Sequence, residues 1–108
     1  MNDKLLSMLG MCRKAGRISM GHDASIASIK NKKARLCLLC CDLSERAMLE
    51  YEKAAENYGR RKLKVIRTKY SMSEIQMALG KKAGAITIND EGFAIRILEI
   101  LNSKIGEE

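Results

Sequence analysis

The sequence predicts an α/β protein built as a three-layer α-β-α sandwich, with one sheet between two layers of helices. Segments whose apolar residues recur at helical spacing alternate with short apolar runs typical of strands, in a pattern of five helices and about four strands. No linker, internal repeat or proline interrupts this alternation. The 108 residues are enough for one domain with a sizeable core, so we expect residues 1–108 to form a single domain.

Two elements precede the glycine at position 21. A helix is predicted over residues 4–15, where three apolar side chains lie at helical spacing on one face. Gly16 follows and is expected to cap the C-terminus of this helix. Residues 17–20 then alternate polar and apolar side chains, a pattern typical of a very short edge strand.

A second helix is predicted to begin at Gly21. Asp23 lies in its first turn, where a negative charge suits the positive end of the helix dipole, and the lysines after residue 29 suit the negative end. Ile26 and Ile29 form its apolar stripe. Three residues are predicted to face away from the core: Ser25, Ser28 and Lys32. The unbonded N–H groups of such a helix start can receive phosphate or base-edge acceptors.

The middle of the chain predicts two further strands with a helix between them. Leu36 to Cys41 is an unbroken apolar run, which indicates a strand buried on both faces. Asp42 or Ser44 can cap the helix that follows, and Gly59 ends it. Residues 63–68 form the next predicted strand. The apolar stripe of the helix is predicted to contain Ala47, Tyr51, Ala54, Ala55 and Tyr58.

Capping residues mark the last two helices. Ser71 and Glu74 have the spacing of a capping box at the start of a short fourth helix. Residues 84–89 form a last small strand, after which Asp90 can cap the C-terminal helix. The packing residues predicted for that helix are Ala94, Ile97, Leu98, Leu101 and Ile105.

Charge and hydropathy define the class of partner. Lys plus Arg number 20 against 13 Asp plus Glu, which gives a net charge of +7 and favours a polyanionic partner, nucleic acid before membrane. No apolar run approaches the roughly 20 residues that span a bilayer, so no membrane partner is expected. Residues 1–4 lack the pattern of a secretory signal, and we therefore expect a cytoplasmic protein.

The four cysteines are expected to be buried, reduced thiols. Cys37, Cys40 and Cys41 fall in the predicted strand, and Cys12 falls on the apolar side of the first helix. Residues three apart in a strand point to opposite faces, so the C-x-x-C of Cys37 and Cys40 does not form a chelating pair. Zinc needs further ligands that a single histidine, His22, does not supply. Neither a metal nor another cofactor is expected.

The motifs of common enzyme sites are missing or incomplete. Gly16 and Gly21 have the spacing of a phosphate-binding loop, but His22 and Asp23 stand where lysine and a hydroxyl residue are required. The sequence contains no G-x-G-x-x-G dinucleotide motif. His22 next to Asp23 has no nucleophile in a recognisable setting. The sequence therefore predicts a protein that is not an enzyme.

Binding of structured RNA fits the sequence better. At least three of the four aromatic residues fit helix stripes or a capped helix end, and no exposed aromatic platform on strands is visible for stacking bases. Two loops combine glycine with cations: the approach to Gly21, with Lys14 and Arg17, and the turn over residues 80–84, which contains two lysines. Glycine permits close approach of the backbone, and the cations can contact phosphate.

Several segments together resemble a known family. Residues 21–24 with 34–42, residues 71–80 and residues 89–94 resemble the L7Ae/L30e superfamily of ribosomal proteins, with a bacterial YlxQ-like branch the most similar. The resemblance extends over nearly the whole chain. It implies an α-β-α sandwich with a mixed four-stranded sheet. It also implies binding of kink-turn RNA through the start of the second helix and the loop before the last strand.

The chain departs from the family pattern at the helix start. The family has Gly-x-Asn-Glu followed by a lysine, which contact sheared G·A pairs. Here Gly21 is kept, but Asp23, Ala24 and Ala27 stand for the Asn, Glu and Lys, and Ile75-Gln76 stands for a Leu-Gly pair. The candidate RNA-binding residues are Lys14, Arg17, Gly21, His22, Asp23, Ala24, Ala27, Lys81, Lys82 and Gly84.

The function expected from the sequence is thus binding of structured RNA of the kink-turn or ribosomal kind, by a monomer. Ribosomal RNA and the ribosome are the candidate partners. The alternative is a ribosome-associated module that contacts proteins through the same helix end without reading RNA. Strongly salt-dependent RNA binding would separate the two, because an RNA-binding protein releases counterions from the phosphates that it contacts.

Overall fold

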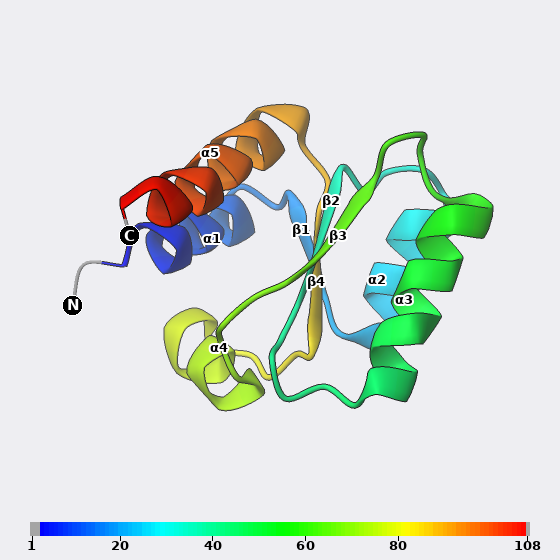
Figure 1. Ribbon diagram of the computed structural model, residues 1–108, viewed down its shortest axis with the longest axis horizontal. Helices are drawn as coiled ribbons and strands as arrows, with labels where there is room; N and C mark the ends of the chain where they lie inside the picture. The colour runs from blue at the N-terminus through cyan, green and yellow to red at the C-terminus, as the bar shows by residue number, and fades with distance from the viewer. Residues whose placement is uncertain (1–2, 108) are drawn as a thin grey trace.

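Four short strands form a single mixed sheet at the centre of the molecule (Figure 1). A computed structural model describes the backbone of residues 3–107 and the side chains of residues 3–103. The spatial order of the strands is β1-β4-β2-β3. Their bounds are Ile18–Met20 for β1, Leu36–Leu39 for β2, Lys64–Arg67 for β3 and Ala85–Ile88 for β4.

The pairing pattern fixes which ends of the strands meet. β4 is antiparallel to both neighbours, with Ile88 opposite Ile18 of β1 and opposite Leu36 of β2. β2 and β3 are parallel, with Leu36 opposite Lys64. Parallel strands require a crossover, and helix α3 supplies it. β2 and β3 therefore begin at one edge of the sheet and end at the other.

Helices cover both faces of the sheet, which confirms the predicted α-β-α sandwich. Figure 1 shows α1, α4 and α5 on one face and α2 and α3 on the other. The bounds are Lys4–Lys14 for α1, His22–Lys30 for α2, Glu45–Tyr58 for α3, Met72–Leu79 for α4 and Glu91–Glu107 for α5. None of the described helices is long and apolar enough to span a bilayer.

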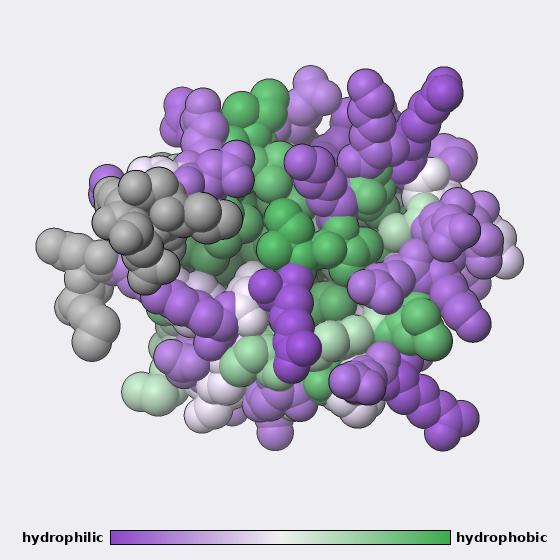
Figure 2. Space-filling view, viewed as in Figure 1, coloured by the Kyte–Doolittle hydropathy of each residue, from purple (hydrophilic) through white to green (hydrophobic). Residues whose placement is uncertain are grey.

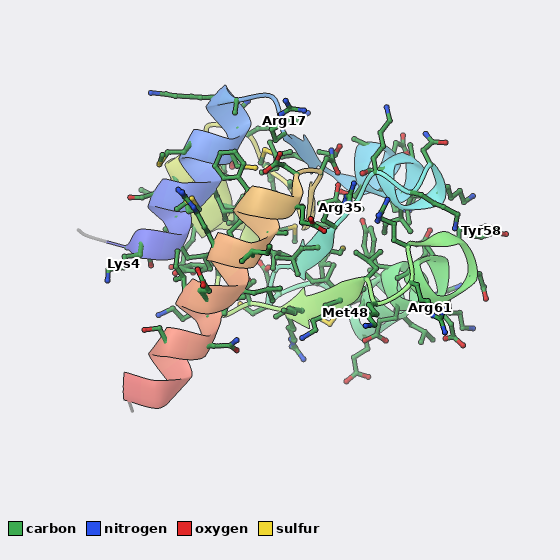
Figure 3. All side chains as sticks on the ribbon, turned by 90° about the horizontal axis from the view of Figure 1, so that it is seen from above. Lys4, Arg17, Arg35, Met48, Tyr58 and Arg61 are labelled. Atoms are coloured by element: carbon green, nitrogen blue, oxygen red, sulfur yellow. The ribbon has the colours of Figure 1, made fainter. Side chains whose placement is uncertain are left out.

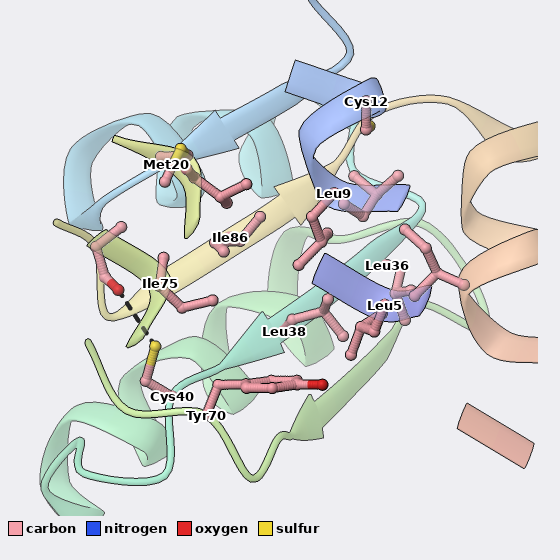
Figure 4. Close-up of a cluster of buried hydrophobic side chains, with 14 of the residues drawn as sticks. Leu5, Leu9, Cys12, Met20, Leu36, Leu38, Cys40, Tyr70, Ile75 and Ile86 are labelled. Carbon is pink, nitrogen blue, oxygen red and sulfur yellow. Dashed lines mark hydrogen bonds between the residues drawn. The ribbon is translucent and has the colours of Figure 1, made fainter. Parts of the chain in front are cut away.

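Two apolar cores lie on either side of the sheet, and β2 contributes to both. Leu36 and Leu38 point into the larger core, where Leu5 and Leu9 of α1 pack against them (Figure 4). The alternate residues of β2, Cys37 and Leu39, point into the core beneath α2 and α3. All four β2 residues are buried, as the continuous apolar run predicts.

The helix ends follow the predicted capping residues. Ser71 Oγ accepts from the Glu74 N–H at 3.1 Å, and a Glu74 carboxylate oxygen accepts from the Ser71 N–H at 3.0 Å, which completes the capping box. Ser44, and not Asp42, caps α3. Asp42 instead accepts from the N–H of Met72, the first residue of α4, at 3.0 Å. Asp90 Oδ2 accepts from the Phe93 N–H at 2.9 Å.

The prediction that Ser25 and Ser28 face away from the core is wrong, because both are buried against the sheet. Their hydroxyls find acceptors there: Ser25 Oγ donates to the Ala85 carbonyl at 3.3 Å, and Ser28 Oγ donates to Asn89 Oδ1 at 2.5 Å. Small side chains let α2 approach the sheet closely, and the hydrogen bonds compensate the burial of their polar atoms.

Other predicted positions also differ. Cys40 and Cys41 lie after β2, which ends at Leu39, because the chain turns toward α3 there. Tyr58, expected on the apolar stripe of α3, is 51% exposed at the last turn of the helix, and Met48 is buried on the inner face instead. Strands β3 and β4 are each one residue shorter at both ends than predicted. Residues 1–2 and the Ile105 side chain lie outside the described part of the molecule.

The cysteine thiols are free, and burial disfavours their ionisation. Desolvation raises the pKa of Cys37 to about 12 and, as the largest cause, the pKa values of Cys12 and Cys40 to about 11. These three thiols are therefore protonated at neutral pH and pack as small apolar groups. Among the described residues, no three His, Cys, Asp or Glu side chains gather as a metal site would need.

The capping box gives a stability prediction. Ser71→Ala removes the acceptor of the Glu74 N–H and should lower the free energy of unfolding by about 1 kcal/mol. The matched control is Ser73→Ala in the first turn of the same helix, which removes an exposed hydroxyl and should change stability by only a few tenths of that. Urea unfolding of both variants measures the difference. Equal effects would show that the box contributes nothing.

Candidate nucleic-acid interface

The start of α2 and the loop before β4 are brought together at one edge of the sheet. The Gly21 N–H donates to the Ala85 carbonyl at 2.9 Å, and Ser25 Oγ donates to the same carbonyl. Ala85 directly follows the loop of residues 80–84, so two segments about sixty residues apart become neighbours. These are the two segments that the family resemblance implies for RNA binding.

The first turn of α2 is exposed and lacks a side-chain cap. Gly21, the N-cap residue, has φ of +94°, a conformation that side chains with a Cβ rarely adopt. The Gly21 carbonyl accepts the first hydrogen bond of the helix, from the Ser25 N–H. The N–H groups of residues 22–24 therefore have no acceptor within the helix. The side chains of His22, Asp23 and Ala24 are exposed, as is that of Ala27 one turn later.

His22 lies between two carboxylates. Its Nδ1 is 2.9 Å from Asp23 Oδ1, and its Nε2 is 2.7 Å from Glu50 Oε2 of α3. Its ring also meets the Tyr51 ring edge-on, with centroids 5.8 Å apart. The hydrogen bond to Asp23, followed by that to Glu50, raises the pKa of His22. The imidazole therefore holds a proton to higher pH than an isolated histidine and offsets negative charge at the helix start.

The sequence did not identify Glu50 and Tyr51 as neighbours of His22. They lie on α3, 28 and 29 positions after His22, and reach it only because α2 and α3 pack side by side on one face of the sheet. The spacing of residues within α2 does not indicate that contact. A sequence signal that pairs the two helices would be needed to find them.

The loop of residues 80–84 is anchored at both ends and exposes two lysines between them. Gly80 ends α4 in the left-handed conformation, with φ of +83°. Lys81 and Lys82 are exposed, whereas Ala83 is buried and accepts from Cys40 Sγ at 3.2 Å. A Cβ on Gly84 would lie 2.5 Å from Leu43 Cδ2, so this glycine serves internal packing.

Lys14 and Arg17 lie in different places. The Arg13 guanidinium donates to the Leu79 carbonyl, and Lys14 lines a hollow with Leu79, which puts it beside the start of the 80–84 loop. Arg17 lies before β1, and its carbonyl accepts from the Asn89 N–H at 2.8 Å. Strand β1 thus separates it from Gly21 by roughly 13 Å, at about 3.3 Å per residue. Proximity in sequence does not bring Arg17 to the helix start.

The resulting edge combines an uncapped helix start with charges of both signs. Asp23 and Glu50 lie on either side of His22, while the cations Lys81 and Lys82 project from the neighbouring loop. Such an arrangement can attract phosphate through the lysines and accept hydrogen bonds from base N–H groups through Asp23.

A sequence comparison finds one family over most of the chain. The sequence model of the ribosomal protein L7Ae/L30e/S12e/Gadd45 family matches residues 3–97. The RNA-binding protein YlxQ of Enterococcus faecium is 26% identical over 98 residues, covering 91% of each chain. The protein of the same name from Bacillus subtilis (strain 168) is 25% identical over 100 residues, covering 88% of this chain and 92% of the relative.

Solved structures share the fold. A protein of unknown function from Bacillus halodurans C superposes with a TM-score of 0.82 at 20% identity, covering 94% of this chain and 99% of that one. A Giardia lamblia 15.5kD RNA binding protein superposes with a TM-score of 0.72 at 15% identity, covering 95% of this chain and 89% of that one. These similarities show that this chain shares the fold of both structures.

The contacts of His22 predict its titration. Asp23→Asn and Glu50→Gln should each lower the pKa of His22, because each removes a carboxylate that stabilises the protonated ring. Because the pKa of His22 is raised in the folded protein, its contacts with Asp23 and Glu50 stabilise the fold fully at a pH below 6.5, the ordinary histidine pKa. This stabilisation is lost as the pH rises through the raised pKa. His22 is the chain's one histidine, so its proton NMR signal is unambiguous. Glu52→Gln is the matched control, and a pKa unmoved by either test variant would contradict the geometry.

Proposed function

The chain belongs to the ribosomal protein L7Ae/L30e/S12e/Gadd45 family, and we propose that it binds structured RNA through the start of α2 and the 80–84 loop. The main observation behind this proposal is the hydrogen bond from the Gly21 N–H to the Ala85 carbonyl, which joins the two segments side by side. The names of the two bacterial relatives, both RNA-binding proteins, support the class of ligand.

The surface offers two kinds of contact with RNA. Lys81 and Lys82 are exposed in the loop that leads to Ala85 and can contact phosphates, and Lys14 lies next to the beginning of that loop. The N–H groups of the first turn of α2 can donate to phosphate or base acceptors. The RNA is of the kink-turn or ribosomal kind, and the protein acts in the cytoplasm as a monomer that associates with the ribosome.

Asp23 sets the expected specificity. An asparagine both donates and accepts, whereas an ionised aspartate only accepts, so Asp23 can take guanine N–H groups but not base acceptors. The contact with His22 offsets part of the negative charge that would otherwise repel phosphates. Ala24 and Ala27, both exposed, offer no polar group where the family has Glu and Lys. We therefore expect weak discrimination between a standard kink-turn and an unrelated duplex.

Salt dependence tests the RNA contact. With about four phosphate contacts, the logarithm of the affinity should fall against the logarithm of salt concentration with a slope of roughly −3 to −4. Lys81→Ala with Lys82→Ala should reduce that slope by up to about 2, because two counterion-releasing contacts are lost. Fluorescence anisotropy with a labelled kink-turn RNA gives both slopes.

The control for this test removes two exposed lysines elsewhere, Lys4→Ala with Lys69→Ala, which should leave the slope nearly unchanged. An unaltered protein whose affinity does not respond to salt would refute RNA binding of this kind. That result would favour the ribosome-associated protein-interaction module.

Restoring the family pattern should restore discrimination. Asp23→Asn, Ala24→Glu and Ala27→Lys together should increase the preference for a kink-turn over a plain duplex by a few kcal/mol at most, at about 1–3 kcal/mol for each good base contact. All three positions are exposed, so the fold should tolerate the changes. Affinities for both RNAs, measured at one salt concentration, give the preference. Nanomolar kink-turn binding by the unaltered protein, unchanged by the substitutions, would show that these positions do not set specificity.

A further inference from the structure

A second basic surface lies at the opposite edge of the sheet. β2 and β3 are parallel neighbours, so the turns that precede them, after α2 and after α3, meet at one edge. Eight of the chain's 20 lysines and arginines lie in these two turns or directly beside them, and residues 30–35 and 60–64 contain no acid. We call this set the basic pole; it consists of Lys30, Lys32, Lys33, Arg35, Arg60, Arg61, Lys62 and Lys64.

The two turns of the basic pole are tied to each other. Lys32 Nζ donates to the carbonyls of Tyr58 at 2.9 Å and Gly59 at 3.2 Å, and Arg60 Nη1 donates to the Lys32 carbonyl at 3.3 Å. Lys32 and Lys62 have φ of +60° and +71°, and among the described residues they are the non-glycine residues with positive φ. Unfavourable backbone conformations of this kind concentrate at functional sites.

Few acids offset this charge. Glu91 lies 3.7 Å from Arg35 Nη1, and Glu52 and Glu56 line a hollow beside residues 60–63. Figure 2 shows long hydrophilic side chains gathered at the upper right of the molecule, over the turn between α3 and β3. The basic pole thus concentrates positive charge more than the α2 start, where Asp23 and Glu50 lie among the cations.

An exposed aromatic ring lies within the basic pole. Tyr58 is 51% exposed, and Lys30 Nζ lies 5.1 Å from its ring centroid. Figure 3 shows Tyr58 and Arg61 on the same side of the molecule, with Arg35 closer to the sheet. The other two tyrosines are buried and Phe93 is half-buried, so the one exposed ring among the tyrosines and the phenylalanine lies among the cations. Exposed aromatic rings among cations are the usual means of holding single-stranded nucleic acid.

The two basic surfaces are separate. Helix α2 runs from one to the other, from His22 beside the proposed RNA-binding edge to Lys30 at the basic pole. Its nine residues span roughly 13 Å at 1.5 Å per residue. The two surfaces therefore lie at opposite ends of one helix and consist of different residues.

We propose that the basic pole is a second RNA-binding surface, which holds a single-stranded segment with an unpaired base stacked on Tyr58. The inference rests on the proposed binding of structured RNA at the α2 start, and it extends that function to RNA in which a folded element adjoins a single strand. The cations contact the phosphates of the strand. An acidic protein could also neutralise the charge, but it would not account for the exposed ring among the cations.

The test compares a hairpin kink-turn RNA with the same RNA carrying a single-stranded tail of about ten adenosines. For the unaltered protein the tail should increase affinity about fivefold or more, and Tyr58→Ala should remove that gain while hairpin affinity stays the same. Tyr58→Phe keeps the ring and should keep the gain. Lys33→Ala with Arg61→Ala and Lys62→Ala should lower the salt slope for the tailed RNA by about 2.

The control variant removes three exposed cations outside both surfaces: Lys4→Ala, Lys69→Ala and Arg96→Ala. Circular dichroism of each variant verifies that it is folded. A tail that adds no affinity, or an equal loss in the basic-pole and control variants, would overturn the inference. If hairpin affinity falls in the variant with Lys81→Ala and Lys82→Ala but not in the basic-pole variants, the proposed RNA-binding edge is supported. If that same variant still gains affinity from the tail, the basic pole is supported independently.

Discussion

The pairing of β4 with both β1 and β2 is the constraint on which the rest of this structure depends. All four residues of β4 are buried, and it is antiparallel to each neighbour, so its two ends are fixed. At its start, the Ala85 carbonyl accepts from the Gly21 N–H and from Ser25 Oγ. One carbonyl thereby fixes where α2 begins and how closely it lies on the sheet. The candidate RNA-binding edge is therefore a consequence of strand pairing, and the loop of residues 80–84 is held beside it by the contacts of Ala83 and Gly84 with Cys40.

Local signals in the sequence were sufficient for the elements and their order. The capping box of Ser71 and Glu74 and the glycine after α3 act over a few residues, so their effect can be predicted without the fold. Burial of Ser25 and Ser28 depends instead on acceptors at positions 85 and 89, which the sequence near α2 does not reveal. The same limit applies to the candidate site. The helix start at Gly21 and the loop of residues 80–84 were named as separate candidate segments, and the hydrogen bond from the Gly21 N–H to the Ala85 carbonyl brings them together. Glu50, in contrast, reaches His22 only through helix packing.

Charge is distributed along α2 in a way that its dipole explains. The helix start has partial positive charge and carries Asp23, and its end has partial negative charge and is followed by lysines. Lys32, just after the end of α2, also donates to the carbonyls of Tyr58 and Gly59 at the end of α3. One side chain thus places positive charge at the C-terminal ends of two helices. Because the acids gather at one end of α2 and the cations at the other, the net charge of +7 is not spread evenly over the surface.

This distribution bears on how the α2 start could contact RNA at all. Asp23 is fully exposed and, alone, would repel phosphates, but its carboxylate is within 2.9 Å of an imidazole whose pKa is raised. A proton on His22 offsets the negative charge of one neighbouring carboxylate, and His22 lies against two, Asp23 and Glu50. Long-range attraction for a polyanion must therefore come from the lysines of the adjacent loop and from the basic pole. In the proposed mode of binding, the helix start orients the RNA at short range through its N–H groups and the carboxylate oxygens of Asp23.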